Sequence, residues 1–590
     1  MAATHRASLH LAACLVVASC GSDAASDTTE ATGSDGSPDA DDGVDEVDDA
    51  AEAASDTTGG TPDNVPPGDG DDIEFSPCRP GLAAGPLGTK RGDLASDFEL
   101  ELVDGSVLSL AATFTGCESF VFISDGIPVS ALDATSIWDS DADFAALLER
   151  SPDDVHYIFV STASEAIAPD HVAAMQARID RTLAGLGPSP RSHWQAHLHV
   201  VAARAQALAA WPSVEASPSL RWPGAAILGH LAPGFAIDHG QLIRGVGSLA
   251  DVSRYDQALA DGGHWAWRQN LAYAAYEADY MRAEHALNER LAVEGADTID
   301  VFRGEVLSQF AEADVVFPSP DELAGFDTVE IEITLRCPDR DKPEFGNCGA
   351  WDYLASLSII EPDMGDGTTP HEVARFITAY HREAHWVVDA TPLLAHVAAG
   401  GTQRLRWEFA PEWNNQPTAT WLSVRFSNRH KGSRPITVVP LFTGGDFGST
   451  YNERAPVVVD IPTTTRRAEV WTLVTGHGAG PNQCAEFCAH RHVINVGATE
   501  YAKGFIEAGD NDGCIPAIEH GMTPNQGGTW WTGRGGWCPG AAVEPWVLDV
   551  SKDVTPGKPV IFTYRGLLVG RDPPDGSGNI VLTSDLVLYE

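Results

Sequence analysis

The sequence predicts a multidomain protein in which an α/β domain is followed by an all-β half made of two jelly rolls. The chain has 590 residues, which is too long for a single hydrophobic core. In its first part, short apolar runs alternate with helix-like segments, a pattern that indicates an α/β layer fold. Beyond about Thr298 it becomes a series of short strand-like segments separated by turn residues, which is typical of sandwiches and jelly rolls. We place the α/β domain at residues 76–296 and the jelly rolls at residues 297–455 and 456–590.

The first twenty residues, MAATHRASLHLAACLVVASC, indicate export. A weakly basic start at His5 and Arg6 is followed by an apolar run too short to span a bilayer, and then by small residues, as in a secretory signal. The ending Val17–Cys20 resembles the lipobox of bacterial lipoproteins, in which Cys20 carries the lipid and becomes the mature N-terminus. We therefore expect a protein that is lipid-anchored to the cell envelope, at the outer membrane or the cell surface. The alternative is an ordinary signal peptide with a chance cysteine.

Residues 21–75 are predicted to form a disordered tether. They contain 18 acidic residues and no Lys or Arg, and they are otherwise rich in Ser, Thr, Gly and Pro. Such a segment buries too little apolar surface to offset its chain entropy, and its like charges repel one another. Without these 18 acidic residues the net charge changes only from −47 to −29. The folded part is thus still acidic, which argues against nucleic acid as a partner, because phosphate contacts need a basic face.

The predicted elements of the α/β domain follow one another in a regular order. Residues 92–110 alternate apolar and polar positions around an Asp-Gly turn, which predicts a hairpin. From Tyr255 to Leu291, aromatic residues at helical spacing predict the helix that closes the domain, and we interpret them as packing rather than as a sugar platform. Between these segments we expect strands at SFVFIS and VHYIFVSTA with a helix at DFAALLER, and then a strand pair within PGAAILGHLAPGFAIDHGQLIRGVG.

This order of elements and the phrases GDLASDFELELVDG and AIDHGQLIRGVG resemble the redoxin branch of thioredoxin-like domains, over about Cys78 to Ser248. Redoxins act through a cysteine of low pKa, commonly in a Cys-x-x-Cys pair. Here the strand FVFIS is followed by DGIPVSALD, which has no cysteine, and Cys117 precedes the strand. We therefore expect a redox-inactive scaffold or docking domain, with a Cys78–Cys117 bond as one option, rather than an active oxidoreductase.

One aspartate of the all-β half stands at the start of a strand-like alternation. In WDYLASLSI, Trp351 and Tyr353 share a face with the aliphatic residues, so Asp352 is expected on the opposite, more polar face. A bond between Cys337 and Cys348 would staple the loop that frames this aspartate. The preceding stretch TVEIEITLRC alternates in the same way, which predicts a strand with its aliphatic residues on one face.

A second acidic residue is held between two cysteines. Eight cysteines follow the signal, an even number that suggests disulfides in an exported chain, although sequence alone does not fix their pairing. In CAEFCAHRH, a bond between Cys484 and Cys488 would form a small turn that aims Glu486. The same cysteines, with His490 and His492, also have the ligand types of a zinc site. Export favours oxidised cysteines, and histidines at i and i+2 also fit one face of a strand, so we expect no metal.

Several motifs of the all-β half together resemble the peptide-N-glycosidase F family, over about Thr298 to Glu590. They occur in the order found in that family: Cys337…Cys348 followed by Trp351-Asp352, RFIT at Arg375–Thr378, TGHG at Thr475–Gly478, CAEFC at Cys484–Cys488 and RGGWCPG at Arg534–Gly540. The family hydrolyses the amide between an asparagine side chain and the first N-acetylglucosamine of an N-glycan, using two packed jelly rolls and no metal or other cofactor. The resemblance therefore implies N-glycans of glycoproteins or glycopeptides as the partner.

The resemblance also implies roles for single residues: an essential aspartate at Asp352, a supporting glutamate at Glu486 and a substrate-contacting arginine at Arg534, at the interface of the two jelly rolls. An amide is a poor electrophile, so a carboxylate must activate water while a donor stabilises the developing oxyanion. We assign the activation of water to Asp352, the ordering of a second water or a sugar hydroxyl to Glu486, and the donor role to Arg534. The implied disulfides are Cys337–Cys348, Cys484–Cys488 and Cys514–Cys538.

Further substrate-binding candidates are His477 of the TGHG motif and four tryptophans that could stack on sugar faces, although core packing explains most tryptophans equally well. The tryptophans are Trp351, Trp413, Trp530 and Trp537.

The chain departs from the family pattern at three positions. Glu412, in APEWN, is the nearest match to a further catalytic carboxylate but is displaced by about one residue. Ala350 replaces an acidic residue before Trp351, and Tyr353 replaces the arginine that usually follows the aspartate. The alternative function is therefore a catalytically inactive surface lipoprotein of the same fold that binds glycans or mediates adhesion. The jelly-roll pair also resembles that of copper-dependent peptide monooxygenases, but no matching set of His and Met is evident. We expect a monomer.

Overall fold

The computed structural model describes residues 78, 81–125, 136–205, 233–251, 269–362, 368–478 and 481–590. The predicted signal peptide with Cys20 and the acidic tether lie outside the described residues. All of the elements named below belong to the unit Pro77–Glu590. In the described part of the chain, no helix combines the length and the apolar composition that crossing a bilayer requires.

A five-stranded sheet of order β5-β4-β3-β6-β7 forms the centre of the α/β part. β3, β4 and β5 are parallel neighbours, whereas β6 and β7 are added antiparallel. The hairpin predicted at residues 92–110 is confirmed as β1 and β2, and the other predicted strands are confirmed as β3, β4, β6 and β7. The elements are β1 (Glu99–Glu101), β2 (Val107–Ser109), α1 (Leu110–Thr113), β3 (Ser119–Ser124), α2 (Asp141–Arg150), β4 (Val155–Val160), α3 (Ala168–Gly185), α4 (Pro188–His197), β5 (Leu198–Val200), β6 (Gly234–Ile237) and β7 (Ile243–Gly245).

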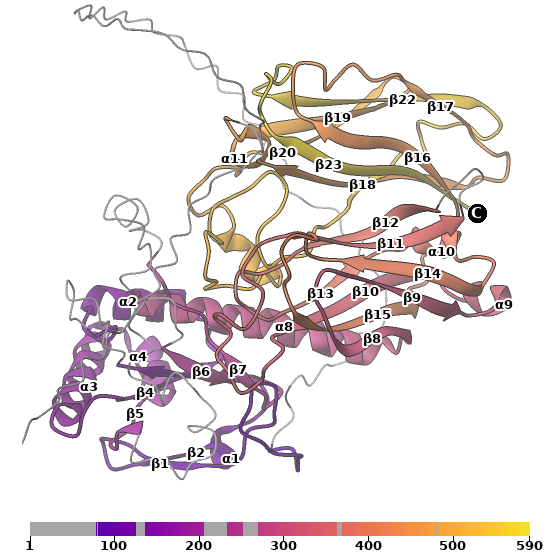
Figure 1. Cartoon of the computed structure of the whole chain (residues 1–590). Coiled ribbons are helices and arrows are strands. Elements are labelled where there is room, and N and C mark those ends of the chain that lie inside the picture. Colours follow the sequence, from indigo (N-terminus) through magenta and orange to yellow (C-terminus); the bar gives the residue numbers. More distant parts are fainter. Residues whose placement is uncertain are drawn as a thin grey trace, which may run out of the picture. The chain divides into compact units, whose positions relative to one another are not determined.

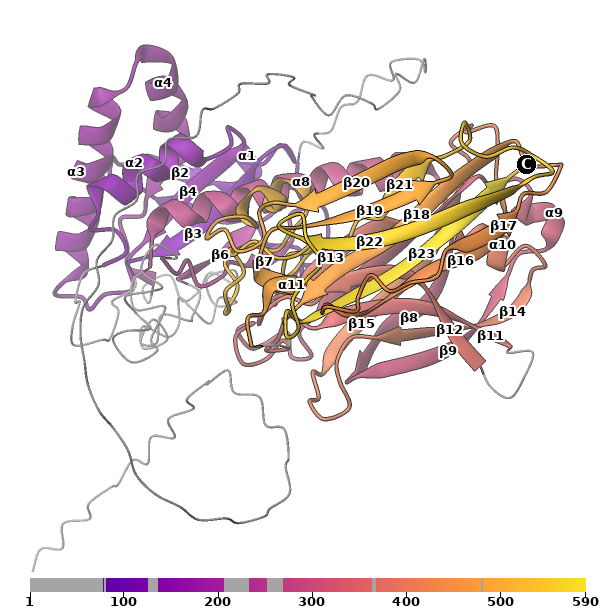
Figure 2. The same ribbon diagram turned by 90° about the horizontal axis from the view of Figure 1, so that it is seen from above.

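The two faces of this sheet are covered by different elements, because alternate side chains of a strand point to opposite faces. Val121 and Ile123 of β3 pack with buried residues of α2, α3 and α8 on one face. Phe120 and Phe122 pack with the β1–β2 hairpin on the other. In Figure 2, the helices α2, α3 and α4 lie together on one side of the sheet strands. The α/β layer is thus present, while the specific likeness to redoxins stays a prediction.

The predicted closing helix is α8 (Ala274–Glu294), which follows the short 3-10 helix η4 (Leu271–Tyr273). It ends at Gly295, whose φ of 63° lies in the left-handed region that glycine adopts without strain. Tyr273 and Tyr280 are buried, which confirms that this part of the aromatic stripe is packing. The part of the prediction that falls on residues 252–268 lies outside the described residues.

The first β-sandwich consists of two four-stranded sheets, with orders β13-β10-β15-β8 and β12-β11-β14-β9. Val329, Ile331, Ile333 and Leu335 of β10 all point into the core between the sheets, as their alternation predicted. The elements are β8 (Asp297–Leu307), β9 (Phe310–Phe317), α9 (Pro320–Leu323), β10 (Thr328–Arg336), β11 (Leu354–Pro362), β12 (Thr368–Ile377), β13 (Ala384–Asp389), α10 (Leu393–His396), β14 (Gly401–Glu408) and β15 (Thr418–Ser427).

The second β-sandwich has the same four-on-four construction, with orders β16-β23-β18-β21 and β17-β22-β19-β20 and a core of its own. The prediction of an all-β half is thus confirmed as two β-sandwiches, and the jelly-roll assignment is consistent with them (Figure 1). The elements are β16 (Pro435–Asp446), β17 (Val457–Asp460), β18 (Arg467–His477), α11 (Cys484–Phe487), β19 (His490–Val496), β20 (Thr499–Phe505), η5 (Ile515–His520), β21 (Trp546–Asp549), β22 (Pro559–Leu568) and β23 (Asn579–Tyr589).

The boundary that we placed at residues 455 and 456 falls too late in the chain. β16 pairs with β23 and so belongs to the second sandwich, which places the change between Ser427 and Pro435. The error has a simple cause: periodicity identifies a strand, but only the hydrogen-bonded partner shows to which sheet the strand belongs.

A buried arginine of the RFIT motif joins the two sandwiches. Arg375 lies in β12, is fully buried, and donates from Nη1 to Thr475 Oγ1 of β18 and to the carbonyl oxygen of Val581 in β23, at 2.9 and 2.8 Å. Its other nitrogens donate to Glu372, which also accepts from Thr583 Oγ1 at 2.7 Å. Because the guanidinium is fully buried and bonded to residues of three strands, it fixes how β12 meets β18 and β23, and thereby the position of any site built from both sandwiches.

A ladder of charged side chains joins α8 to the first sandwich. His385 of β13 lies between Glu284 of α8, at 3.5 Å, and Glu332 of β10, at 3.1 Å. Burial alone lowers the pKa of His385, but these two carboxylates outweigh burial and raise the pKa to about 9. Arg244 and Arg425 pair with the outer sides of the same carboxylates. The imidazolium is therefore the central cation of the ladder at neutral pH.

We expect this ladder to make stability fall as the pH rises. The pKa of His385 is about 9 in the folded protein, against 6.5 for an ordinary histidine, so its contribution is complete below about pH 6.5 and is lost as the pH rises through 9. The difference corresponds to at most about 3 kcal/mol. The free energy of unfolding, measured in urea, should fall more between pH 6 and pH 9 for the unmodified protein than for His385→Gln. Equal losses in the two proteins would contradict the assignment.

Candidate active site

Asp352 lies in the loop that precedes β11, not within a strand. β11 begins at Leu354, so the alternation expected from Trp351 onward does not hold. Trp351 is 40% exposed, whereas the side chain of Asp352 is only 16% exposed. The expectation that Trp351 shares a strand face with the aliphatic residues while Asp352 projects from the opposite, polar face was therefore wrong. Alternation fails here because it is enforced by the hydrogen-bonded pairing of strands, which begins only at Leu354.

The threonine of the RFIT motif clamps the backbone on both sides of Asp352. Thr378 Oγ1 donates to the carbonyl oxygen of Trp351 at 2.6 Å and accepts from the amide of Tyr353 at 2.8 Å. One residue further back, the amide of Ala350 donates to Gln416 Oε1 at 2.5 Å. A loop would otherwise leave Asp352 free to rotate away, so these bonds give the aspartate a defined direction.

Glu486 comes from the second sandwich, on the one-turn helix α11. The Cys484–Cys488 disulfide closes this turn. Glu486 Oε2 accepts from the amide of Gly478, in the TGHG motif, at 2.6 Å. A Cβ atom at Gly478 would lie 2.9 Å from that oxygen, so glycine permits the close approach. The carboxylate is thus anchored at one oxygen, while its other oxygen, Oε1, faces an arginine.

Arg534 lies between the two carboxylates. Its Nε donates to Glu486 Oε1 at 3.2 Å, and Nη2 lies 3.5 Å from Asp352 Oδ2. The guanidinium is 2% exposed, and it also donates to the carbonyl oxygens of Thr529 and Thr532 and to Thr529 Oγ1. All three nitrogens are therefore engaged, and only the contact to Asp352 is long. The geometry makes Arg534 the shared counterion of the two carboxylates.

Burial dominates the electrostatics of this cluster. It raises the pKa of Asp352, and the nearby Arg534 guanidinium and Tyr380 hydroxyl only partly offset it. Burial also raises the pKa of Glu486, again opposed by Arg534 and reinforced by the negative charge of Asp352. Two buried carboxylates thus share one cation, an arrangement typical of functional sites, where groups must exchange protons nearer neutral pH.

Tyr380 is a site residue that the sequence reasoning missed. Its hydroxyl hydrogen-bonds with Asp352, and its pKa is raised well above the ordinary value, first by burial and then by the charge of Asp352. The hydroxyl therefore stays protonated and donates to the carboxylate. A signal was available, because Tyr380 follows the RFIT motif by two residues and lies three residues beyond the end of β12, the strand that carries Arg375.

Two of the tryptophans proposed to stack on sugars are packing residues instead. Trp530 is 1% exposed and packs edge-on against Tyr276 and Trp531. Trp537 is 7% exposed, and its ring contacts Arg534 and stacks on His477. Neither ring can stack on a sugar, because stacking requires a ring face that is open to solvent.

His477, also proposed to bind substrate, lies on Trp537 beneath the site. Its Nε2 is 2.9 Å from Thr475 Oγ1, the hydroxyl that also accepts from Arg375. Burial, followed by the charges of Arg375 and Arg534, lowers the pKa of His477 to about 3. The imidazole is therefore neutral at neutral pH, and its described contacts are structural.

Two other proposed tryptophans and Glu412 lie at the rim. Trp413 is 79% exposed and meets Tyr353 edge-on, and Trp351 is 40% exposed, so both can receive a ligand. Glu412 is exposed, and its carbonyl oxygen accepts from Gln309. Among the described residues its carboxylate makes no hydrogen bond or ion pair with Asp352, Glu486 or Arg534. The structure thus brings Asp352 and Glu486 together and leaves Glu412 outside their cluster.

A cavity of about 470 Å³ lies elsewhere, between α8 and the outer face of β10. Its charged lining is largely paired internally, for example Arg244 with Glu284 and His385 with Glu332. Despite their burial, Glu284 and Glu332 have pKa values lowered by these cationic partners. The pKa values of Asp352 and Glu486 are instead raised by burial, so the Asp352 cluster is the better candidate for proton-transfer chemistry.

Comparison with known proteins relates the chain to one family. Residues 447–587 match the family model described as peptide-N-glycosidase F, C terminal. The C-terminal region belongs to the peptide-N-glycosidase F family. Over 285 residues the chain is 24% identical to peptide-N(4)-(N-acetyl-beta-D-glucosaminyl)asparagine amidase F of Elizabethkingia miricola, covering 44% of this chain and 73% of that protein.

Solved structures of proteins with related names are also similar to this chain. PNGase F, a glycosylasparaginase from Flavobacterium meningosepticum, is 19% identical, with 50% of this chain and 96% of that chain covered and a TM-score of 0.41. PNGF-II in a C2 crystal form is 14% identical, with 60% and 74% covered and a TM-score of 0.37.

The match to the family model covers only part of the cluster. Glu486 and Arg534 lie within residues 447–587, whereas Asp352 and Tyr380 lie in the first sandwich, before the matched segment. It is the contact of Arg534 with Asp352 that links the matched region to the rest of the site.

All four described disulfides agree with the expectations. The pairs implied by the peptide-N-glycosidase F resemblance are confirmed, and Cys78 is bonded to Cys117, the option that the sequence left open. The zinc alternative loses its two thiolates, because Cys484 and Cys488 are bonded to each other. His490 and His492 instead belong to β19, where His492 hydrogen-bonds with the Tyr564 hydroxyl.

The Cys484–Cys488 bond should matter more for activity than for stability. It closes a loop of sequence separation 4, so its removal as Cys484→Ser/Cys488→Ser should cost about 2 kcal/mol of unfolding free energy. Because α11 carries Glu486, we expect glycan release to fall about tenfold even where the protein is folded.

The matched control is Cys78→Ser/Cys117→Ser, which opens a loop of separation 39 in the α/β part and should cost about 4 kcal/mol. We expect it to leave the rate of the folded protein unchanged. Thermal unfolding checks the expected stabilities of the two double variants, and rates of glycan release at 20 °C check their activities. Equal activity of the two double variants would contradict the role of α11.

Proposed function

We propose that the protein is an amidohydrolase that cleaves the amide between asparagine and the first N-acetylglucosamine of N-glycoproteins or glycopeptides, releasing the glycan and leaving aspartate. The observation that carries the proposal is the pair Asp352 and Glu486, brought from different sandwiches onto Arg534. The relationship to the Elizabethkingia amidase, which is named for this linkage, supports it.

In this reaction the Asp352 carboxylate accepts a proton from water while the water oxygen bonds to the amide carbon. The carbon–nitrogen bond then breaks, and the proton held by Asp352 is available to the departing glycosylamine nitrogen. Burial, which raises the pKa of Asp352, makes the carboxylate a stronger base than an ordinary aspartate. Tyr380 holds the carboxylate by its hydroxyl, so that the base keeps its direction during the transfer.

Arg534 and Glu486 complete the arrangement. The Arg534 guanidinium opposes the burial that raises the pKa values of both carboxylates. Its Nη2, which donates to Thr529 Oγ1 and makes the long contact with Asp352, is the nitrogen placed to donate to an oxyanion that develops beside Asp352. Glu486 is positioned to order a second water or a sugar hydroxyl. The exposed rings of Trp351 and Trp413 offer faces on which sugars can stack.

The alternative is a glycan-binding or adhesion protein without turnover. The departures at Ala350 and Tyr353, and the position of Glu412 outside the cluster, motivate it. The exposed tryptophans serve binding in both functions, so only product formation separates the two.

Mass spectrometry of an N-glycopeptide incubated with the purified exported protein tests the proposal. Release of the intact glycan, with conversion of asparagine to aspartate, is expected. The α/β part should be retained, because α8 shares buried ion pairs with the first sandwich. An unchanged glycopeptide, with retained glycan affinity that disappears in Trp413→Ala, would instead establish the alternative.

We also propose that the protein is an exported monomer held at the cell envelope by a lipid on Cys20. Radiolabelled palmitate should enter the full-length protein but not its Cys20→Ala variant, because the thiol is the acceptor of the lipid. Cys14→Ala, which changes the other cysteine of the signal, is the control and should label normally. Equal labelling of all three proteins would remove the anchor.

A further inference from the structure

One loop of the second sandwich, Thr523–Thr529, holds two residues of the candidate site. Tyr380 donates its amide to Gln526 Oε1 at 2.8 Å and accepts from the amide of Gly527 at 3.1 Å. A side chain at Gly528 would collide with the Tyr380 ring, so this ring packs directly on the loop backbone. At its far end, Thr529 accepts two hydrogen bonds from Arg534, each of 3.0 Å. The loop therefore sets the positions of both groups that contact Asp352.

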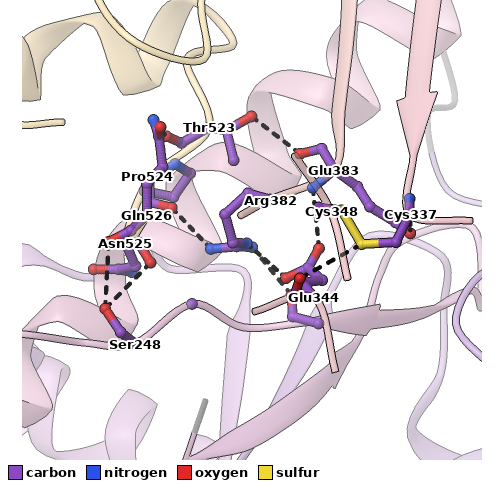
Figure 3. A network of polar contacts seen from close by, with 12 residues as sticks. Ser248, Cys337, Glu344, Cys348, Arg382, Glu383, Thr523, Pro524, Asn525 and Gln526 are labelled. Atoms are coloured by element: carbon purple, nitrogen blue, oxygen red, sulfur yellow. Dashed lines mark hydrogen bonds and ion pairs between the residues drawn. A yellow bond between two sulfur atoms is a disulfide. The ribbon is translucent and has the colours of Figure 1, made fainter. Parts of the chain in front are cut away.

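The same loop is attached to the α/β part of the protein. Asn525 is 1% exposed and donates from Nδ2 to Glu277 Oε1 at 2.9 Å and to the carbonyl oxygen of Tyr273 at 3.0 Å. Its own carbonyl oxygen accepts from the amide of Ser248 at 2.9 Å. Figure 3 shows Ser248 directly beside Asn525 and Gln526. The loop is thus fixed from the side opposite to the site.

A buried arginine reinforces this attachment. Arg382 is two residues beyond Tyr380, is 6% exposed at its side chain, and contacts Glu277 through two nitrogens, at 2.9 and 3.2 Å. It also donates to the carbonyl oxygen of Pro524 at 2.8 Å and pairs with Glu344 at 2.7 Å (Figure 3). Glu277 itself is 2% exposed. The loop cannot leave without uncovering a buried charge pair, which is costly.

Asn525 also has a special backbone conformation. Its φ of 50° lies in the left-handed region, which asparagine tolerates better than most residues and glycine adopts freely. The strain is held in place by the bonds of its side chain to Tyr273 and Glu277. Replacement by glycine therefore keeps the backbone allowed and removes only these bonds.

We propose that Glu277 and Asn525 are positioning residues, through which the α/β part holds Tyr380 and Arg534 against Asp352. This inference rests on the proposed function for its effect on catalysis, and it assigns the α/β part a role in the amidase site. Neither residue touches the reacting atoms; both act through the Thr523–Thr529 loop.

The predicted signature is a change in pH dependence. The ionisable groups that face Asp352 are Arg534, Glu486, Tyr380 and Tyr353. Arg534 and Tyr380 favour the ionised carboxylate, so loosening them raises the pKa of the base. The acid limb of kcat/KM should then move to higher pH by about 0.5 or more. A merely structural loss would reduce the active fraction without moving the limb.

The experiment compares the full exported chain with Asn525→Gly, Glu277→Gln and the control Arg290→Ala. Arg290 also joins α8 to a sandwich, through Glu330 at 3.0 Å, but it makes no described contact with the loop. Two readouts are measured: the pH profile of glycan release, and amide hydrogen exchange of peptides that contain Tyr380 and Gly527. The exchange readout does not need activity, so it separates failure of this inference from failure of the proposed function.

We expect faster exchange in both peptides and an upward shift of the acid limb in Asn525→Gly, a smaller shift in Glu277→Gln, and neither change in Arg290→Ala. Unchanged exchange and an unmoved limb in Asn525→Gly would overturn the inference, as would equal effects in Arg290→Ala. If the unmodified protein releases no glycan while Asn525→Gly still exchanges faster, the proposed function fails and the positioning of the loop stands.

Discussion

Asp352→Asn should reduce glycan release at least about a hundredfold without unfolding the protein. Asparagine has nearly the same shape but cannot accept a proton from water, so the general-base contribution is lost. The thermal unfolding temperature should not fall, because the variant removes a carboxylate whose burial already raises its pKa and opposes ionisation. Single-turnover release of glycan from a glycopeptide, measured by mass spectrometry, provides the rate.

The matched control is Asp339→Asn, in the preceding loop, which the Cys337–Cys348 disulfide closes. Asp339 is 38% exposed at its side chain and pairs with Lys342 at the surface. The Asp339→Asn variant should therefore release glycan at the rate of the unmodified protein. In the unmodified protein the acid limb should lie above pH 3.8, the ordinary aspartate value, since burial raises the pKa of Asp352. Full activity of Asp352→Asn would remove the aspartate from the mechanism and with it the proposed function.

Arg534→Met should damage both activity and stability. The substitution leaves the carboxylates of Asp352 and Glu486 buried without their cation, and breaking a buried ion pair by removing one partner costs about 3–5 kcal/mol. Glycan release should fall at least about a hundredfold, since the charge that supports the ionised base and the oxyanion is lost. The activity and stability of Arg534→Lys should lie between those of Arg534→Met and the unmodified protein, because lysine keeps the charge but not the planar guanidinium.

The stability cost should depend on pH in a defined direction. Without Arg534 the pKa values of both carboxylates rise further above their unfolded values, so the folded state binds protons more tightly. Stability then falls as the pH rises above the unfolded values and recovers as the carboxylates are protonated on acidification. Denaturant unfolding between pH 4 and pH 8 should therefore show a difference between Arg534→Met and the unmodified protein that shrinks at low pH.

A second buried arginine provides the control for that experiment. Arg178 lies in α3 of the α/β part, is 8% exposed and pairs with Asp141. Arg178→Met should lower stability but leave the release rate of the folded protein unchanged, because none of its contacts reaches the site. A pH-independent cost in Arg534→Met, equal to that of Arg178→Met, would contradict the shared-counterion role.

Local pattern was enough to predict many elements, whereas the bonds between cysteines of the all-β half were implied by the family resemblance. The strand β10 and the hairpin β1–β2 follow from alternation, which is a property of consecutive residues. The cysteine-framed motifs, through their family resemblance, indicated the pairs Cys484–Cys488 and Cys514–Cys538 and placed Glu486 and Arg534 among the site candidates. The redoxin likeness and the N-terminal lipid remain predictions.

Burial and direction were harder to predict than identity. Trp530 and Trp537 look like sugar platforms in the sequence, yet the folded chain covers both rings. Asp352 was assigned to the polar side of a strand, and the structure places it in a loop whose direction is set by Thr378. Tyr380 was missed although it follows the RFIT motif by two residues, because only the folded chain brings its hydroxyl to Asp352.

The sequence by itself determined the succession of an α/β part and an all-β half, the acidic and cysteine-framed segments, and which carboxylates to examine. Only the tertiary structure decided that Arg534 lies between Asp352 and Glu486, that β16 belongs to the second sandwich, and that Glu277 of α8 holds the loop beneath Tyr380. The physical reason is that periodicity and motif spacing report interactions between residues close in the chain, whereas a buried charge finds its partner through packing of elements that are far apart in it.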